Sequence, residues 1–228
     1  MALAAIFLSL PVVLIVLNKT NTDIELGVKP LRLATRARRR AQDDSRDLLT
    51  SAALARLNDL EQALVALAEA DADEIDEVAG NWFDLLCEDL AFVLGIGTNQ
   101  RFRIAIWTDD ETDPAYLRGL AYYGFDRNDP KYDKLSRLGT VAGWAVANRR
   151  EHYARDVAND AIYLGRTGPA RYRSMVAVPL GAPDDPWAVM TVDAEERDGL
   201  DETRRALIRR FGSLASTGAA LAILDRGV

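Results

Sequence analysis

Two residue types that build many functional sites are scarce in this chain. Its 228 residues include one cysteine, Cys87, and one histidine, His152. This scarcity excludes a disulfide framework and a zinc site made only of Cys and His ligands. A serine or cysteine nucleophile would have only His152 as its base, and no nearby residue marks a third member for such a triad. The cysteine usage fits a reducing compartment.

Positive charge is also in short supply. The 28 Lys and Arg residues are outnumbered by 35 Asp and Glu residues, which gives a formal net charge of −7 at pH 7. Because binding to phosphate backbones depends on clustered Lys and Arg, this balance argues against a nucleic-acid partner. The chain also lacks a phosphate-binding loop of the Walker type. Its 49% hydrophobic content is enough for a sizeable core in one or two domains.

The chain begins with a long apolar run over residues 2–17. As a helix this run would span about 24 Å, a little less than the ~30 Å hydrocarbon core of a bilayer. It has no basic residue before it and no small-residue cleavage motif after it, which disfavours a removed signal peptide. Basic residues from Lys19 to Arg40 follow, so the positive-inside rule places the rest in the cytoplasm. We predict a single-pass anchor in the cell inner membrane; the alternative is a buried core helix.

Helical periodicity follows the apolar run. Residues from about 31 to 70 read as one helix, and its basic run over residues 36–40 is either a topology signal on a solvated face or a contact to anionic lipid headgroups. Further helices are predicted over residues 73–94 and after residue 201. We expect a short coiled coil, because leucines of the first helix have the 3-4-3 spacing of a coiled-coil seam. These leucines are Leu57, Leu60, Leu64 and Leu67.

Strand patterns fill the middle of the chain. Residues 102–107 alternate in polarity and predict a strand with one face on a core, and residues 116–125 predict its returning neighbour. From residue 138, a glycine-punctuated helix is followed by a short strand over residues 151–157. The extended run Tyr172-Arg173-Ser174-Met175-Val176-Ala177-Val178-Pro179-Leu180 and the strand Trp187-Ala188-Val189-Met190-Thr191-Val192-Asp193 complete this stretch.

The order of elements over residues 138–193 resembles the C-terminal half of a GAF domain, the small-molecule-sensing module of phytochromes and many bacterial regulators. The resemblance implies an α+β fold in α/β/α layers, with an antiparallel sheet flanked by helices and preceded by a long helix and the membrane helix. We expect a transmembrane signal-anchor helix over residues 1–18, then a basic juxtamembrane segment and helical linker with the short coiled coil over 19–72. The GAF-like sensory domain follows over 73–228. Because GAF domains often dimerise through their flanking helices, the resemblance also implies a homodimer.

The connection over residues 156–171 is the main candidate for a ligand site. Connections of about 16 residues without regular structure are usually either functional or disordered, and this one offers donors, acceptors and an aromatic ring. In GAF domains the corresponding segment lines or covers a pocket over one face of the sheet. Arg173 and Ser174 match the Arg-Ser that introduces the following strand, and Arg173 is expected to hold either Asp156 or an anionic ligand. The expected ligand-binding residues are Tyr123, Trp144, Asp156, Tyr163, Arg166, Arg171, Arg173, Ser174 and Met190.

No cofactor, metal ion or catalytic residue is expected. GAF proteins that reduce free methionine sulfoxide rely on several cysteines, and a haem-binding GAF domain needs an axial histidine. His152 is the sole candidate for such a ligand, and on a short strand a packed or surface histidine is commoner. The Asn-Lys-Phe-Asp-Glu set of nucleotide-binding GAF domains is not traceable here. We therefore expect a non-enzymatic protein.

Two functions stay open from the sequence. The first is a membrane-anchored cytoplasmic sensor that binds a small, nucleotide-like ligand and signals through its flanking helices. The second is a ligand-free dimerisation or scaffolding module that recruits a partner protein to the membrane. Since no kinase, cyclase or DNA-binding module follows the domain before Val228, we expect the output to pass through the membrane helix, the coiled coil or a partner signalling protein.

Overall fold

The computed structural model describes residues 29–71, 74–125, 133–162 and 172–224. The chain divides into two compact units, residues 1–44 and residues 45–228. In the first unit the described residues are the beginning of helix α3, which runs from Lys29 to Glu69. The predicted anchor over residues 2–17 lies outside the described residues. Of the helices within them, none combines the length and the apolar character that crossing a bilayer requires.

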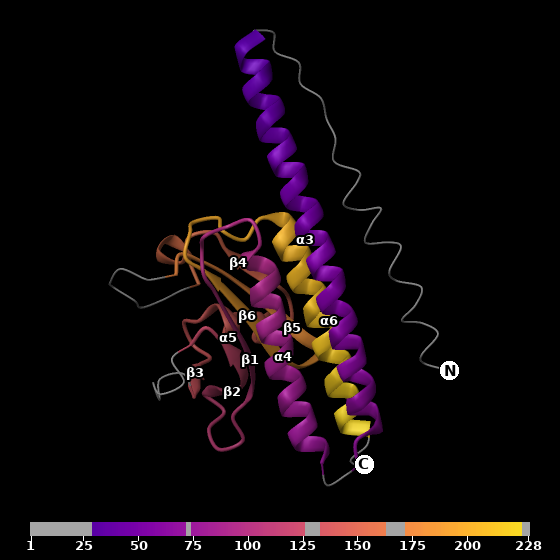
Figure 1. Ribbon diagram of the computed structural model, residues 1–228. Helices are drawn as coiled ribbons and strands as arrows, with labels where there is room; N and C mark the ends of the chain where they lie inside the picture. The colour runs from indigo at the N-terminus through magenta and orange to yellow at the C-terminus, as the bar shows by residue number, and fades with distance from the viewer. Residues whose placement is uncertain (1–28, 72–73, 126–132, 163–171, 225–228) are drawn as a thin grey trace. The chain divides into compact units, whose positions relative to one another are not determined.

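The second unit is built on a six-stranded sheet in the order β3-β2-β1-β6-β5-β4 (Figure 1). Every pair of neighbouring strands is antiparallel. Strand β1 lies between β2 and β6, so that Ile104 is paired with Tyr123 on one side and with Val192 on the other. The strands are β1 Phe102–Asp109, β2 Tyr116–Tyr123, β3 Lys134–Ser136, β4 His152–Ala154, β5 Ser174–Ala182 and β6 Asp185–Ala194.

Helices cover both faces of this sheet. Helix α4, Ile75–Gly95, and helix α6, Glu202–Leu224, pack on each other and on one face, which we call the α4/α6 face. Helix α5, Val141–Asn148, packs on the other face, the α5 face. The short helix η2, Val157–Asn159, follows β4. The expected layered α+β architecture with an antiparallel sheet is confirmed.

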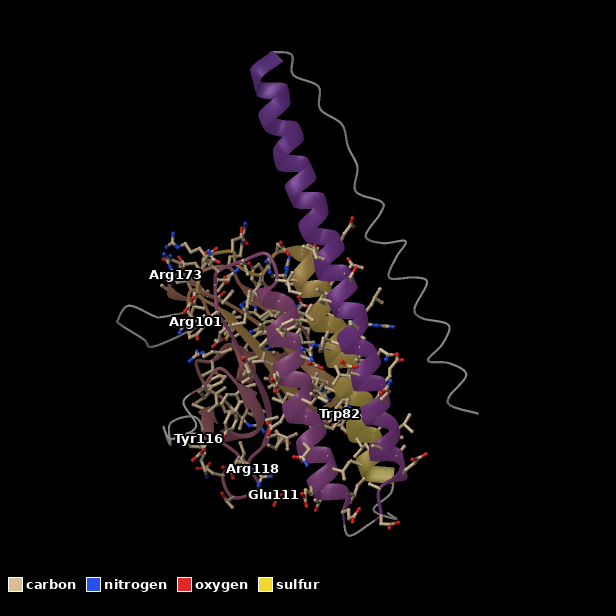
Figure 2. All side chains as sticks on the ribbon, in the orientation of Figure 1. Trp82, Arg101, Glu111, Tyr116, Arg118 and Arg173 are labelled. Atoms are coloured by element: carbon tan, nitrogen blue, oxygen red, sulfur yellow. The ribbon has the colours of Figure 1, made fainter. Side chains whose placement is uncertain are left out.

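The larger core lies between the α4/α6 face and the helices. Leu60 and Leu67 of α3 are fully buried in it, and the indole nitrogen of Trp82 donates a hydrogen bond to the carbonyl oxygen of Leu60 over 3.4 Å. Trp82 lies among the helices in Figure 2. At Gly218 of α6 an added Cβ would stand 2.5 Å from the Trp82 ring, so only glycine permits this approach.

The leucine stripe of α3 is therefore used inside the chain. Leu60, Leu64 and Leu67 are buried against α4 and α6, and Leu57 packs against the same core. The prediction that this stripe forms a coiled-coil seam between two copies is corrected accordingly. The leucine spacing identified an apolar face of the helix. Such a face can be buried either by a core within the chain or by a second copy of the chain, and here the core within the chain buries it.

Helix α5 covers a smaller core on the opposite face. Its N-terminus is capped by Thr140, whose hydroxyl oxygen accepts from the backbone N–H of Gly143 over 3.2 Å. An added Cβ at Gly143 would stand 1.9 Å from the carbonyl oxygen of Arg137, which explains a glycine inside this helix. Val141, Ala142 and Ala145 then pack on the central strands. This face carries the charged and aromatic side chains described next.

Candidate ligand site on the α5 face of the sheet

Arg103 and Asp193 form an ion pair on the α5 face, at the end of the sheet where β1 begins and β6 ends. They are paired in register on the neighbouring strands β1 and β6. Arg103 points to the same face as Ala105 and Trp107, because alternate residues of β1 such as Ile104 enter the opposite core. The Nε of Arg103 donates to Oδ2 of Asp193 over 2.9 Å, and the side chains are only 16% and 4% exposed. A charge pair thus lies where an apolar core would be expected.

Aromatic rings enclose the guanidinium group of Arg103. Its carbon lies 4.0 Å from the ring centre of Tyr172 and 4.6 Å from that of Phe125. Phe125 also meets Trp107 edge-on, with ring centres 6.4 Å apart. The indole nitrogen of Trp107 donates to the hydroxyl oxygen of Thr191 over 2.9 Å. The floor of this face therefore combines charge, hydrogen-bonding groups and stacked rings.

A second polar group lies beside helix α5. The ring of Trp144 is 4.9 Å from the ring of His152, measured between centres, and the guanidinium carbon of Arg150 lies 4.9 Å from the centre of the Trp144 ring. The Nε2 of His152 and Oδ2 of Asp160 are hydrogen-bonded at 2.9 Å. The backbone N–H of Ile162 donates to the other oxygen of Asp160 over 2.9 Å. The structure thus places Trp144 next to titratable and cationic groups.

The buried pair calls for an explanation other than stability. Removing two charges from water costs about as much as their mutual attraction returns, and replacing a buried pair by apolar residues is often neutral or stabilising. A paired Arg and Asp can nevertheless exchange partners with a polar ligand, the cation taking an anionic group and the carboxylate taking a donor. Aromatic rings nearby can stack on a planar ligand. This set of groups can bind a small polar molecule.

Two of the predicted site residues have other partners. The carboxylate of Asp156 pairs with Arg197 and accepts from the side-chain amide of Asn159 over 2.6 Å. Arg173 is exposed and lies at the outer edge of the domain in Figure 2, where its backbone bonds to Val157 and Ala194. The pair expected between Arg173 and Asp156 is thus corrected to one between Arg197 and Asp156.

Three more predicted residues lie on the α4/α6 side. The hydroxyl of Ser174 is fully buried; it donates to the carbonyl oxygen of Glu196 and accepts from the N–H of Gly199. Met190 is fully buried in the larger core. Tyr123 is exposed beside α4. The structure therefore does not bring these residues to the α5 face. Tyr163, Arg166 and Arg171 lie outside the described residues.

Sequence reasoning missed Arg103 and Asp193. A signal was present, because each is a charged residue next to an apolar stretch of its strand. Their side chains point to the opposite face from those of Ile104 and Val192. What the pattern could not supply was the pairing of two residues 90 positions apart. The contribution of Phe125 and Tyr172 also depends on that pairing, because both rings enclose the arginine side of the pair.

Thiol and metal chemistry find little support in the described residues. Cys87 is fully buried on α4, and burial raises the pKa of its thiol far above the ordinary value, with a smaller contribution from Asp84. Among the described residues no cluster of three or more His, Cys, Asp or Glu side chains could hold a metal ion. Where the structure describes the chain, charge and stacking are thus the main chemical resources of the α5 face.

The described structure is an α+β domain with an antiparallel sheet, helices on both faces and a group of polar side chains on one of them. The particular family follows from the sequence. The family model described as GAF domain matches residues 90–218, more than half of the chain, and the chain belongs to this family. No curated protein sequence matches the chain.

Solved structures show the same fold. The GAF domain of a phosphoenolpyruvate-protein phosphotransferase from Coxiella burnetii superposes with a TM-score of 0.57 at 13% identity, covering 77% of this chain and 99% of that one. Free methionine-R-sulfoxide reductase from Neisseria meningitidis, in complex with its substrate, gives a TM-score of 0.57 at 16% identity over 75% and 92%. Residues 122 to 287 of a methyl-accepting chemotaxis protein give 0.54 at 22% identity over 73% and 99%. The fold thus occurs both in a protein named as an enzyme and in a protein named for chemotaxis.

Proposed function

We propose that this chain is a sensory module whose GAF domain binds a small polar ligand on the α5 face. The observation that carries the proposal is the buried pair of Arg103 and Asp193, enclosed by the rings of Phe125 and Tyr172. Such a pair contributes little to stability by itself. It offers a cation and a carboxylate, side by side, to a ligand that brings both an acceptor and a donor.

A nucleotide-like ligand fits the chemistry of this face. Its phosphate or another anionic group would face Arg103, and its planar base would stack on an aromatic ring. Trp144, with Arg150 above its ring and His152 beside it, is a second stacking surface on the same face. These resources favour a planar anion over a purely aliphatic ligand.

Signalling would depend on the central strands, whose successive side chains point alternately to the ligand side and to the helical core. Arg103 faces the ligand side, and its neighbours Phe102 and Ile104 enter the core shared with α3, α4 and α6. A shift of β1 or β6 at the ligand therefore reaches these helices directly. Packed helices tend to have discrete arrangements, so such a shift can select between them.

The decisive experiment compares two double variants by native mass spectrometry and calorimetry. Arg103→Met with Asp193→Leu removes the pair while leaving an apolar core, so the fold should persist. Arg209→Met with Glu151→Leu removes an exposed pair as a matched control. The protein purified without added ligand is analysed first, followed by titration with cyclic and linear nucleotides. Binding by the wild type and the control, and its loss in the first variant, support the proposal.

The opposite pattern rejects it. If the folded Arg103→Met, Asp193→Leu variant retains the same bound mass or the same heat of binding as the wild type, the α5 face is not the site.

The mass spectrum also reports the number of subunits. A homodimer is part of the proposal, because α3 exposes Leu48, Leu54 and Val65.

Membrane attachment is proposed from the sequence alone. The apolar run over residues 2–17 and the basic residues after it support a single-pass anchor with the domain in the cytoplasm. Introducing two charges by Leu10→Lys and Val13→Arg should move the protein from the membrane pellet to the soluble fraction. Each charge at a helix centre opposes insertion by about 2.5–3.5 kcal/mol. Unchanged pelleting of the folded variant would contradict the anchor.

The proposal includes no catalytic step. The Neisseria relative in fold is named a reductase, and thiol chemistry of that kind requires an accessible thiolate. Cys87 is buried on α4, and its pKa is raised by that burial. A ligand-binding role uses the groups that the α5 face presents.

A further inference from the structure

A separate groove runs along the α4/α6 side of the domain. Its volume is about 630 Å³, within the range of small-molecule pockets. It extends from α3 along the C-terminal half of α4 to the beginning of β1 and the end of β2. Its walls include Arg56, Glu88, Asp89, Phe92, Arg101 and Tyr123.

Asp89 is the most unusual residue of this groove. It is only 1% exposed, and its Oδ1 lies 3.1 Å from the guanidinium of Arg56 on α3. Its Oδ2 is equally buried and has no hydrogen-bond partner among the described residues. A buried acceptor left unpaired is rare in folded proteins, because it loses its bonds to water and gains none in return. The oxygen requires a donor.

The surrounding groups define which donor fits. Glu88 adds a second carboxylate, and Phe92 exposes 53% of its surface in the same groove. The guanidinium of Arg56 already lies over the Phe92 ring, 4.5 Å from its centre. The chain's own cation thus shows that this wall, a carboxylate beside an aromatic face, accepts a positive charge.

The charge state of Asp89 agrees with that requirement. Burial raises the pKa of Asp89, the carboxylates of Asp59 on α3 and Glu88 on α4 raise it further, and Arg56 opposes them. Burial is the main cause of this shift, and Arg56 is the strongest single charge that acts on Asp89. Because a buried carboxylate is stabilised most by a charged hydrogen-bond donor, a cationic group at Oδ2 offsets the cost of burial best.

We propose that this groove is a binding site for a small ligand that carries an ammonium or guanidinium group, which donates to Oδ2 of Asp89 while the rest of the ligand lies against Phe92. Asp89 and Phe92 lie on α4, on the opposite face of the sheet from the Arg103–Asp193 pair, although Tyr172, which stacks on Arg103, also lines the groove. A neutral donor would also satisfy the oxygen, but a hydrogen bond from a charged donor to a carboxylate is roughly twice as strong as one between neutral groups.

The test uses n-hexylammonium as the probe, with 1-hexanol and hexanoate as matched neutral and anionic probes. Binding to the full chain is measured by saturation-transfer NMR and by the shift in Tm. We expect n-hexylammonium to bind, and the two matched probes to bind more weakly by about tenfold or more, the factor expected for a charge-assisted hydrogen bond. Equal binding of all three probes, or no binding of the ammonium, overturns the proposal.

Three variants locate the site. Asp89→Asn should lower the affinity for n-hexylammonium by about tenfold or more, and Phe92→Ser, at an exposed position, by about threefold. Asp84→Asn removes a charge from an exposed position of the same helix outside the groove and should leave affinity unchanged. If Asp89→Asn and Asp84→Asn bind the probe equally well, the groove is not the site. The Arg103→Met, Asp193→Leu variant should bind the probe as the wild type does, which separates this proposal from the first.

Discussion

The two sides of the sheet hold their buried carboxylates in different ways. On the α5 face, Asp193 is bonded to Arg103, whose guanidinium is enclosed by aromatic rings and which comes from an adjacent strand in a fixed register. On the α4/α6 side, Asp89 is bonded through one oxygen to Arg56, which comes from another helix and is 37% exposed. Because one arginine is enclosed and the other is partly exposed, removing the arginine should change the free energy of unfolding by different amounts on the two sides. The first pair is sensitive to truncation, and the second is open to an added ligand.

The largest expected effect is the loss of the enclosed partner. Arg103→Ala leaves the charge of Asp193 buried next to an empty space, which should lower the free energy of unfolding by about 3–5 kcal/mol. Arg56→Ala also removes the partner of a buried carboxylate, but Arg56 is 37% exposed, so water can reach the vacated position and the loss should be smaller. Urea denaturation of both variants measures the difference. Equal losses would show that the two sides hold their carboxylates in the same way.

The next effect tests the helical side alone. Leu60 of α3 is fully buried against the other helices, so Leu60→Ala should destabilise the domain by about 2–5 kcal/mol. Leu54→Ala, on an exposed position of the same helix, should change stability by less than about 0.5 kcal/mol. Thermal denaturation at two protein concentrations is the measurement. A loss for Leu60→Ala that disappears at high protein concentration would favour the coiled-coil seam between copies over the intramolecular core.

The pH dependence of stability sharpens the contrast at Asp89. Its pKa in the folded state is raised from 3.8, chiefly by burial. Asp89 therefore favours the folded state most below the unfolded pKa, and this contribution is lost as pH rises through the folded pKa. The Tm of Asp89→Asn relative to wild type should accordingly rise with pH across this window. A difference that falls with pH would mean that Arg56 dominates and that the carboxylate is fully balanced.

The smallest effect concerns an exposed carboxylate with strong partners. The pKa of Asp198 is lowered to about 2, first by the hydrogen bond from Arg155 and then by that from Tyr153. The same neighbourhood, chiefly burial and then the bond to Asp198, raises the pKa of Tyr153 to about 12. The contribution of Asp198 is present above its unfolded pKa and is lost as pH falls toward the folded value. Asp198→Asn should therefore flatten the loss of Tm between pH 4 and pH 2, as thermal scans would show. An unchanged slope contradicts the assignment.

Much of the fold was predictable, because it rests on local patterns. The alternation over residues 102–107 and the extended apolar run over residues 172–180 predicted strands, and they correspond to β1 and β5 of the sheet. The order of elements over residues 138–193 was sufficient for the family resemblance, which the family comparison confirms. These signals depend on the backbone period of each element, which a chain carries in its own sequence.

The candidate site was less predictable. Trp144 was expected there and has cationic and titratable neighbours, whereas Met190 and Ser174 belong to the opposite side. Strand alternation fixes which residues share a face, but it does not say which face meets which helix. Arg103 went unnoticed because a single charge in a strand has no meaning until its cross-strand partner is known.

The sequence by itself determined the element types, the GAF-type order of strands and helices, the lack of paired cysteines and histidines, and the excess of negative charge. Only the tertiary structure decided that Arg103 faces Asp193, that the leucines of α3 are buried within the chain, and that Asp89 is enclosed with one oxygen unpaired. The physical reason is the range of the interactions. The hydrophobic period that defines a helix or a strand is set by a few neighbouring residues. Hydrophobic attraction has no preferred direction, so an apolar stripe can pack against any apolar partner. The energy of a charged side chain depends on the groups that the fold places around it.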